Sequence, residues 1–179
     1  MTRSGAGSSL MADLAVGLLA GLVATHVTNL AQGPLKRMTP VSVRRHEERV
    51  RPGATSSLVA AQGLARVLDA PPCAARDEVC GQAIHFGVGM GWGPVYGLLR
   101  RYAGLRPTRA ALTTGAAMAL ILDETLVPAL GLSAPTHHYR ALTHLRGLIA
   151  HLVYGAAVAL AAEGLARAAN GRAAGSSRH

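Results

Sequence analysis

Five side chains capable of acid–base chemistry lie inside apolar stretches of this sequence. They are three histidines and an adjacent pair of carboxylates, namely His26, His85, Asp123, Glu124 and His151. Ionisable groups are costly in the hydrocarbon core of a bilayer, so within long apolar segments they mark proton relays, ion pathways or ligand sites. Imidazole exchanges a proton near neutral pH. We therefore expect these residues to carry whatever chemistry the protein performs.

The stretches that hold these residues are long enough to cross a membrane. The hydrocarbon core takes roughly 20 apolar residues of helix, and the sequence offers four such segments, at about residues 11–32, 79–99, 109–132 and 142–166. Gly33 and Pro34 are expected to end the first segment. The chain is 50% apolar and 15% charged, more apolar than a soluble domain needs. These features predict an all-α fold, an integral membrane bundle of four transmembrane helices that forms one domain over residues 11–166.

The remaining segments are the two ends and the long connection between the first two spans. Residues 1–10 are expected to be a flexible N-terminus, and residues 167–179 a disordered tail rich in Gly, Ser and Arg. In the connection, apolar residues recur at helical spacing over residues 57–69, which predicts an amphipathic helix on the membrane surface. Pro71 and Pro72 should end that helix.

The depths at which these polar residues are predicted to lie in the membrane place them in one candidate site. Consecutive spans run in opposite directions, so His26 and His85 each lie six residues from the same membrane face, at a depth of roughly 9 Å. Asp123, Glu124 and His151 lie eight or nine residues from that face, at roughly 12 to 14 Å. All five are predicted in one half of the bilayer. Adjacent residues are about 100° apart around a helix, so only one of Asp123 and Glu124 is expected to face the site.

Two helical stripes accompany this polar layer. On the fourth span Tyr154 shares a face with His151, in line with His144 and Gly147. On the second span the four-residue spacing of its glycines lets another helix approach closely, and it suits a homodimer; these residues are Gly89, Gly93 and Gly97.

Three interpretations of the polar layer remain open. It is a buried network that pairs helices, a proton or ion pathway, or a metal or haem site for which His85, Asp123 and His151 are the candidate ligands. No HExxH, CxxCH or ExxH motif supports a metal, so we expect no cofactor. The sequence also lacks a nucleophile elbow and a Walker lysine, and we expect no enzymatic activity.

The net charge of +9 comes from arginines beside the apolar segments rather than from a nucleic-acid-binding motif. Their position predicts anionic lipid headgroups as partners and no nucleic acid. Basic residues are nearly balanced between the two faces, and a cytoplasmic first connection is only weakly favoured. Cys73 and Cys80 are seven residues apart, without a zinc or redox motif, and we expect unpaired thiols.

Three short segments resemble the YagU-like family of uncharacterised bacterial inner-membrane proteins. They run from His85 to Gly97, from Pro128 to Gly131 and from Ala150 to Gly155. The resemblance implies a multi-pass protein of the bacterial inner membrane with a role in acid tolerance. The family carries a Ser-Glu pair before the last histidine where this chain has Leu145 and Arg146, which leaves Asp123 or Glu124 as the expected partner of His151.

From these observations we expect a small membrane protein that handles protons or a small ion through a polar half-channel. The half-channel should open to the face of the first and third connections. Two alternatives remain, a protein that binds metal or haem through the intramembrane histidines and an accessory or structural membrane subunit.

Overall fold

The computed structural model describes residues 10–51, 53–69 and 77–176, and all regular structure in them is helical. In chain order the elements are α1 (Leu10–Met38), α2 (Val41–Val50), α3 (Ser56–Val67), α4 (Asp77–Tyr102), α5 (Pro107–Met118), the π-helix η2 (Ala119–Leu126), α6 (Val127–Ala129), the 3-10 turn η3 (Thr136–His138) and α7 (Ala141–Ser176).

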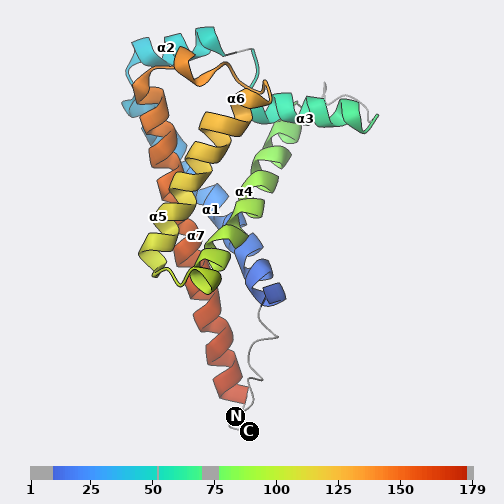
Figure 1. The fold of residues 1–179 in the computed structure, drawn as a ribbon, viewed down its shortest axis with the longest axis vertical. Coiled ribbons are helices and arrows are strands. Elements are labelled where there is room, and N and C mark those ends of the chain that lie inside the picture. Colours follow the sequence, from blue (N-terminus) through green and yellow to red (C-terminus); the bar gives the residue numbers. More distant parts are fainter. Residues whose placement is uncertain (1–9, 52, 70–76, 177–179) are drawn as a thin grey trace.

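The long helices form an up-and-down bundle. α1, α4, the continuous segment α5–η2–α6 and α7 alternate in direction (Figure 1). α2, α3 and η3 gather at one end of the bundle, which we call the loop end. The opposite end, which we call the terminal end, holds the start of α1, the short α4–α5 link and the C-terminal part of α7 (Figure 1).

Three of the long helices are long and apolar enough to cross a membrane. They are Leu10–Met38, Pro107–Ala129 and Ala141–Ala169. This agrees with a helical membrane protein. α4 has the necessary length but is more polar, so the second predicted span, residues 79–99, is not among these three.

Two helix ends differ from the sequence-based prediction. α1 continues through Pro34 to Met38 instead of ending at Gly33. A proline costs a helix one backbone hydrogen bond, and apolar helices tolerate it when neighbouring groups compensate. α7 runs to Ser176, although a disordered tail was predicted from residue 167. Its last turns are rich in alanine, the strongest helix former, which explains the extension.

Glycines bring the helices into backbone contact. A Cβ on Gly93 of α4 would collide with the carbonyl oxygen of Gly17 on α1, and one on Gly89 would collide with the Thr25 hydroxyl. Gly97 is looser, because a Cβ there would lie 3.8 Å from the carbonyl oxygen of Asp13. The glycine stripe on α4 therefore faces α1 of the same chain, so it no longer argues for a homodimer.

A second glycine contact joins α5 to α7. A Cβ on Gly115 would meet the backbone of His151, and one on Gly155 would meet the backbone of Ala111. This contact brings α5 and the continuous η2 segment against the face of α7 that carries the polar residues. The sequence analysis did not single out Gly115.

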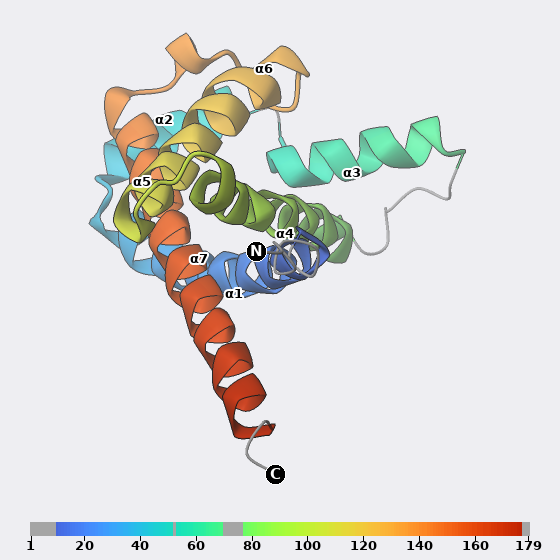
Figure 2. The same ribbon diagram turned by 60° about the horizontal axis from the view of Figure 1, so that its bottom comes forward.

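The predicted helix in the first connection is present as α3. Thr55 caps its N-terminus by accepting a hydrogen bond from the Leu58 backbone N–H, and Leu58 packs against Gly81 of α4. α3 lies across the direction of the long helices (Figures 1 and 2). Leu64 and Val67 are exposed on it.

The expectation of unpaired thiols is wrong for Cys80, which is disulfide-bonded near the start of α4. Cys73, the chain's other cysteine, lies outside the described residues. Disulfides persist in oxidising compartments and are rare in the cytosol.

Candidate functional site

The deepest ionisable pair of the site joins η2 to α7. His151 Nε2 lies 2.9 Å from Asp123 Oδ2. The His151 side chain is only 16% exposed, whereas that of Asp123 is 45% exposed. Gly147 leaves room for the carboxylate, since a Cβ there would lie 3.3 Å from Asp123 Oδ2. The structure thus joins two of the residues that the sequence singled out.

A second pair of the same kind lies nearer the loop end. His144 Nδ1 is 2.6 Å from Glu124 Oε1, and His144 Nε2 is 3.1 Å from the Thr136 carbonyl oxygen. The carbonyl can only accept, so Nε2 carries the proton that points to it. His144 had been placed on the correct stripe of α7 but was not chosen as a site residue. Its spacing of seven from His151 was the available signal.

The π-helix explains why both carboxylates reach α7. In η2 the Val127 backbone N–H donates to Leu122, and the Thr125 hydroxyl donates to Leu120, both five residues back. A five-residue repeat turns less per residue than an α-helix, which brings neighbouring side chains closer to one face. Asp123 therefore meets His151, one of the predicted site residues, while Glu124 meets the polar neighbour His144. π-Helical turns frequently occur at functional sites.

His85 contributes a third imidazole from α4. Its Nε2 lies 2.9 Å from Asn29 Oδ1 on α1, so Nε2 donates to the amide oxygen. His85 lies one turn before Gly89, whose carbonyl oxygen accepts a hydrogen bond from Tyr154 of α7. Asn29 was missed because a neutral amide does not stand out in an apolar segment.

His26 does not join this group. It lies on the exposed face of α1 and makes no hydrogen bond with any described residue. The sequence predicted how far along α1 His26 lies, but it did not predict the direction in which the side chain points around the helix axis. Thr25 and Thr28, on the buried face of α1, instead donate to backbone carbonyls one turn earlier.

Tyr154 fixes α7 to α4 beneath the histidines. Its hydroxyl donates to the Gly89 carbonyl oxygen at 2.5 Å, and the side chain is fully buried. The bond gives Tyr154 a positioning role on the stripe it shares with His151. Buried polar groups are paired in this way because an unpaired one costs free energy.

His151 has one ring nitrogen without a partner. Its Nδ1 is buried and makes no hydrogen bond within the described residues, while Nε2 faces Asp123. A buried imidazole nitrogen needs a donor or an acceptor in either protonation state. Nδ1 is therefore the position at which a proton could enter or leave the Asp123 pair. We call His85, Asp123, Glu124, His144 and His151 the histidine–carboxylate layer.

The layer does not resemble a metal centre. Among residues 10–51, 53–69 and 77–176 no group of three or more His, Cys, Asp or Glu side chains could hold a metal ion. Of the proposed ligands, His151 pairs with Asp123, and His85 pairs with Asn29.

A salt-bridge cluster closes the loop end beside the layer. Glu47 of α2, only 8% exposed, accepts from Arg146 of α7 with both carboxylate oxygens, at 2.8 and 2.7 Å, and from Arg51 at 2.7 Å. His46 also lies 2.8 Å from the His138 carbonyl oxygen. α2 and the η3 turn are thereby held over the start of α7.

Replacing Arg146 by Gln should loosen this cluster. Glu47 would keep Arg51 but lose two charge-assisted hydrogen bonds, at a cost of about 2 kcal/mol. Thermal unfolding in detergent would measure the loss. Glu48→Gln, a change on the exposed residue beside Glu47, is the matched control and should leave the melting temperature unchanged.

Comparison with known proteins adds no family to this description: no protein-family model matches the chain, and no curated protein or solved structure matches it either. The fold and its three apolar helices fit the class of helical membrane proteins.

Proposed function

We propose that this protein moves protons, or a small ion in their place, through a polar half-channel that opens at the loop end. The observation that carries the proposal is the pair of histidine–carboxylate contacts between η2 and α7, at 2.6 and 2.9 Å. His144 and His151 lie two turns apart, roughly 10 Å along α7. Staggered, protonatable groups at different depths are what a relay requires.

The route begins at His144 and ends near His85. Glu124 holds His144 on the side of the η3 turn. Asp123, the residue before Glu124, pairs with His151, and His85 would be the last group of the route. Protons would pass between imidazoles and carboxylates, each in contact with water or with the next group. Below this point the core is apolar and tightly packed around Ala20, Ala24 and Val158, which would block leakage.

In this proposal the protein is a YagU-like protein of the bacterial inner membrane with four spans. α4 would be the second of these spans in chain order, because it is packed lengthwise against α1 and its 26 residues cover roughly 39 Å. His85, one of its polar residues, is half-buried and bonds to Asn29 of α1. α3 would lie in the membrane surface.

A structural role is the competing proposal. Hydrogen bonds between membrane helices also serve to hold the helices together, and the Tyr154 contact with Gly89 has that character. Proton flux separates the two proposals. Purified protein in liposomes that contain a pH-sensitive dye should dissipate an imposed pH gradient faster than protein-free liposomes do. Equal rates of gradient dissipation with and without the protein would contradict proton transport and favour the structural role.

Two features at opposite ends of the bundle support a proposal for the orientation of the protein in the membrane. The disulfide on Cys80 favours an oxidising compartment for the loop end. The short α4–α5 link at the terminal end and the helix ends beside it are rich in arginine, which favours the cytoplasm; these residues are Arg100 and Arg101 of α4, Arg106 in the link and Arg109 of α5. We therefore propose that the half-channel opens outside the cytoplasm, opposite to the weak preference from the sequence.

Membrane-impermeant maleimide applied to spheroplasts tests this orientation. A cysteine replacing His137 in η3, at the loop end, should be labelled, and one replacing Thr108 at the start of α5 should be labelled only after lysis. Both positions are exposed, so access to the reagent is the only difference expected. The reverse pattern would show that the loop end is cytoplasmic.

A further inference from the structure

A second polar site lies at the terminal end, far from the histidine–carboxylate layer. A cavity of about 260 Å³ opens there between α1, α4 and α7. Small residues of α1 and α7 form part of its wall, so the three helices leave a space between them; these residues are Gly17, Ala162 and Ala166. It is smaller than the roughly 300–1,000 Å³ of a drug-sized pocket. A headgroup-sized ligand fits that size.

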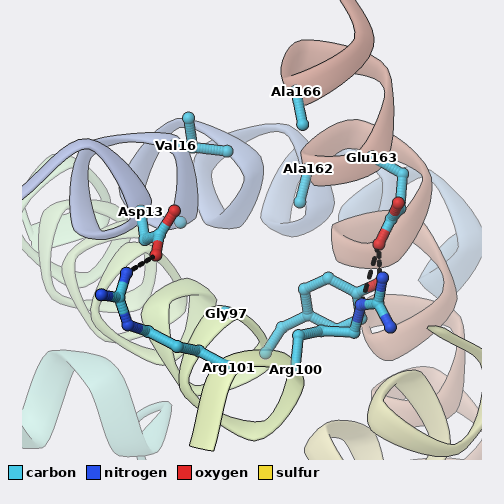
Figure 3. A pocket seen from close by; sticks show the side chains of 10 residues that line it. Asp13, Val16, Gly97, Arg100, Arg101, Ala162, Glu163 and Ala166 are labelled. Carbon is cyan, nitrogen blue, oxygen red and sulfur yellow. Dashed lines mark hydrogen bonds and ion pairs between the residues drawn. The ribbon is translucent and has the colours of Figure 1, made fainter. Parts of the chain in front are cut away.

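Each side of the cavity carries one ion pair (Figure 3). Arg101 of α4 donates to Asp13 of α1 at 2.7 Å, and Arg100 donates to Glu163 of α7 at 3.0 Å. The Tyr96 hydroxyl adds a bond to Glu163 at 2.9 Å. The four charges sum to zero. The cavity therefore offers both signs of charge within one small space.

Both carboxylates retain an oxygen for a ligand. Glu163 accepts its two bonds with Oε1, and Asp13 accepts its bond with Oδ2. Within the described residues, Glu163 Oε2 and Asp13 Oδ1 accept no hydrogen bond. Arg100 uses its Nε and Nη1 donors, the latter on the Leu105 carbonyl oxygen, and a guanidinium has five N–H groups.

The surroundings of the cavity are apolar and face outward. Leu19 of α1, Leu98 of α4 and Leu160 of α7 are exposed on the neighbouring helix surfaces. Exposed leucines of this kind can contact the acyl chains of a lipid. The charged groups of the cavity lie near the ends of apolar helices, the level at which a membrane has its headgroups.

We propose that this cavity binds the headgroup of a zwitterionic phospholipid whose amine carries N–H donors, that is, a phosphatidylethanolamine. The phosphate would accept from Arg100, and the ammonium would donate to the open oxygen of Glu163 or Asp13. A purely anionic headgroup would accept hydrogen bonds from Arg100, but its negative charge would be repelled by the carboxylates of Asp13 and Glu163. A choline headgroup would lack the N–H donors.

Native mass spectrometry of the full-length protein tests this assignment. Detergent-purified, delipidated protein is titrated with phosphatidylethanolamine, phosphatidylcholine and phosphatidylglycerol of identical acyl chains. Phosphatidylethanolamine should bind roughly tenfold more tightly than the other two, the expected effect of one well-placed charged hydrogen bond. Equal binding of all three lipids, or tighter binding of phosphatidylglycerol, would overturn the proposal.

Variants link the lipid to the cavity. Glu163→Gln removes a charge, and Ala166→Leu fills the cavity from an exposed wall position without changing charge. Both should abolish the preference for phosphatidylethanolamine. Glu124→Gln, at the opposite end of the bundle, is the control and should retain it. A preference that survives in Ala166→Leu protein, whose fold is checked by circular dichroism, would show that the lipid binds elsewhere.

Discussion

Asp123→Asn should reduce proton flux in proteoliposomes by roughly 100-fold, the lower range for the loss of a positioned acid–base group. Asparagine has nearly the same shape as aspartate and can still accept a hydrogen bond from His151, so the helix contact is preserved. It cannot take up a proton. Flux would be followed with an entrapped pH-sensitive dye under a fixed pH gradient.

His26→Ala is the matched control for Asp123→Asn. His26 is also an ionisable residue inside an apolar helix, but it lies on the exposed face of α1. Its removal should leave the flux at the wild-type rate. Wild-type flux in Asp123→Asn protein would exclude Asp123 from the pathway, and equal losses in both variants would indicate a general disturbance of the membrane helices.

Gly93→Ala should destabilise the protein through overpacking, by roughly 1–3 kcal/mol. The new methyl group would collide with the Gly17 carbonyl oxygen, and a backbone group cannot move aside as the end of a side chain can. α1 and α4 would then have to separate along their contact. Thermal unfolding in detergent, followed by circular dichroism, would measure the loss.

Gly91 provides an internal control on the same helix. Nothing lies within 4 Å of a Cβ built at Gly91, so Gly91→Ala should add only the helix propensity of alanine, about 1 kcal/mol of stabilisation. The two substitutions are chemically identical and two residues apart, which separates close packing from propensity. Equal stability of the two variants would contradict the glycine-mediated contact between α1 and α4.

The approximate positions of the long helices could be predicted because they depend on local sequence. Long apolar runs bounded by Gly, Pro and Arg indicate where α1, α4 and α7 lie. Their exact ends were less predictable, because the effect of Pro34 on α1 depends on neighbouring helices and the last turns of α7 depend on alanine propensity rather than on apolarity.

The contact between His151 and Asp123 was expected from the sequence, whereas the contacts of Glu124 and His85 were not. A spacing argument placed His151 and Asp123 at the same depth, and the structure joins them. The π-helix that turns Glu124 toward His144 depends on its backbone hydrogen bonds, and no pattern of residue types in the sequence predicts those bonds. The contact between Asn29 and His85 depends on the relative rotation of α1 and α4, which their glycine contact sets.

Chemical rescue of His151→Ala by imidazole tests most directly whether the layer carries protons. The variant removes the imidazole that faces Asp123 and leaves a space of its size, so flux should fall to the protein-free rate. Free imidazole added to these proteoliposomes should restore flux in His151→Ala and should not restore it in Asp123→Asn. Wild-type flux in His151→Ala without imidazole would contradict the proton pathway proposed for the histidine–carboxylate layer.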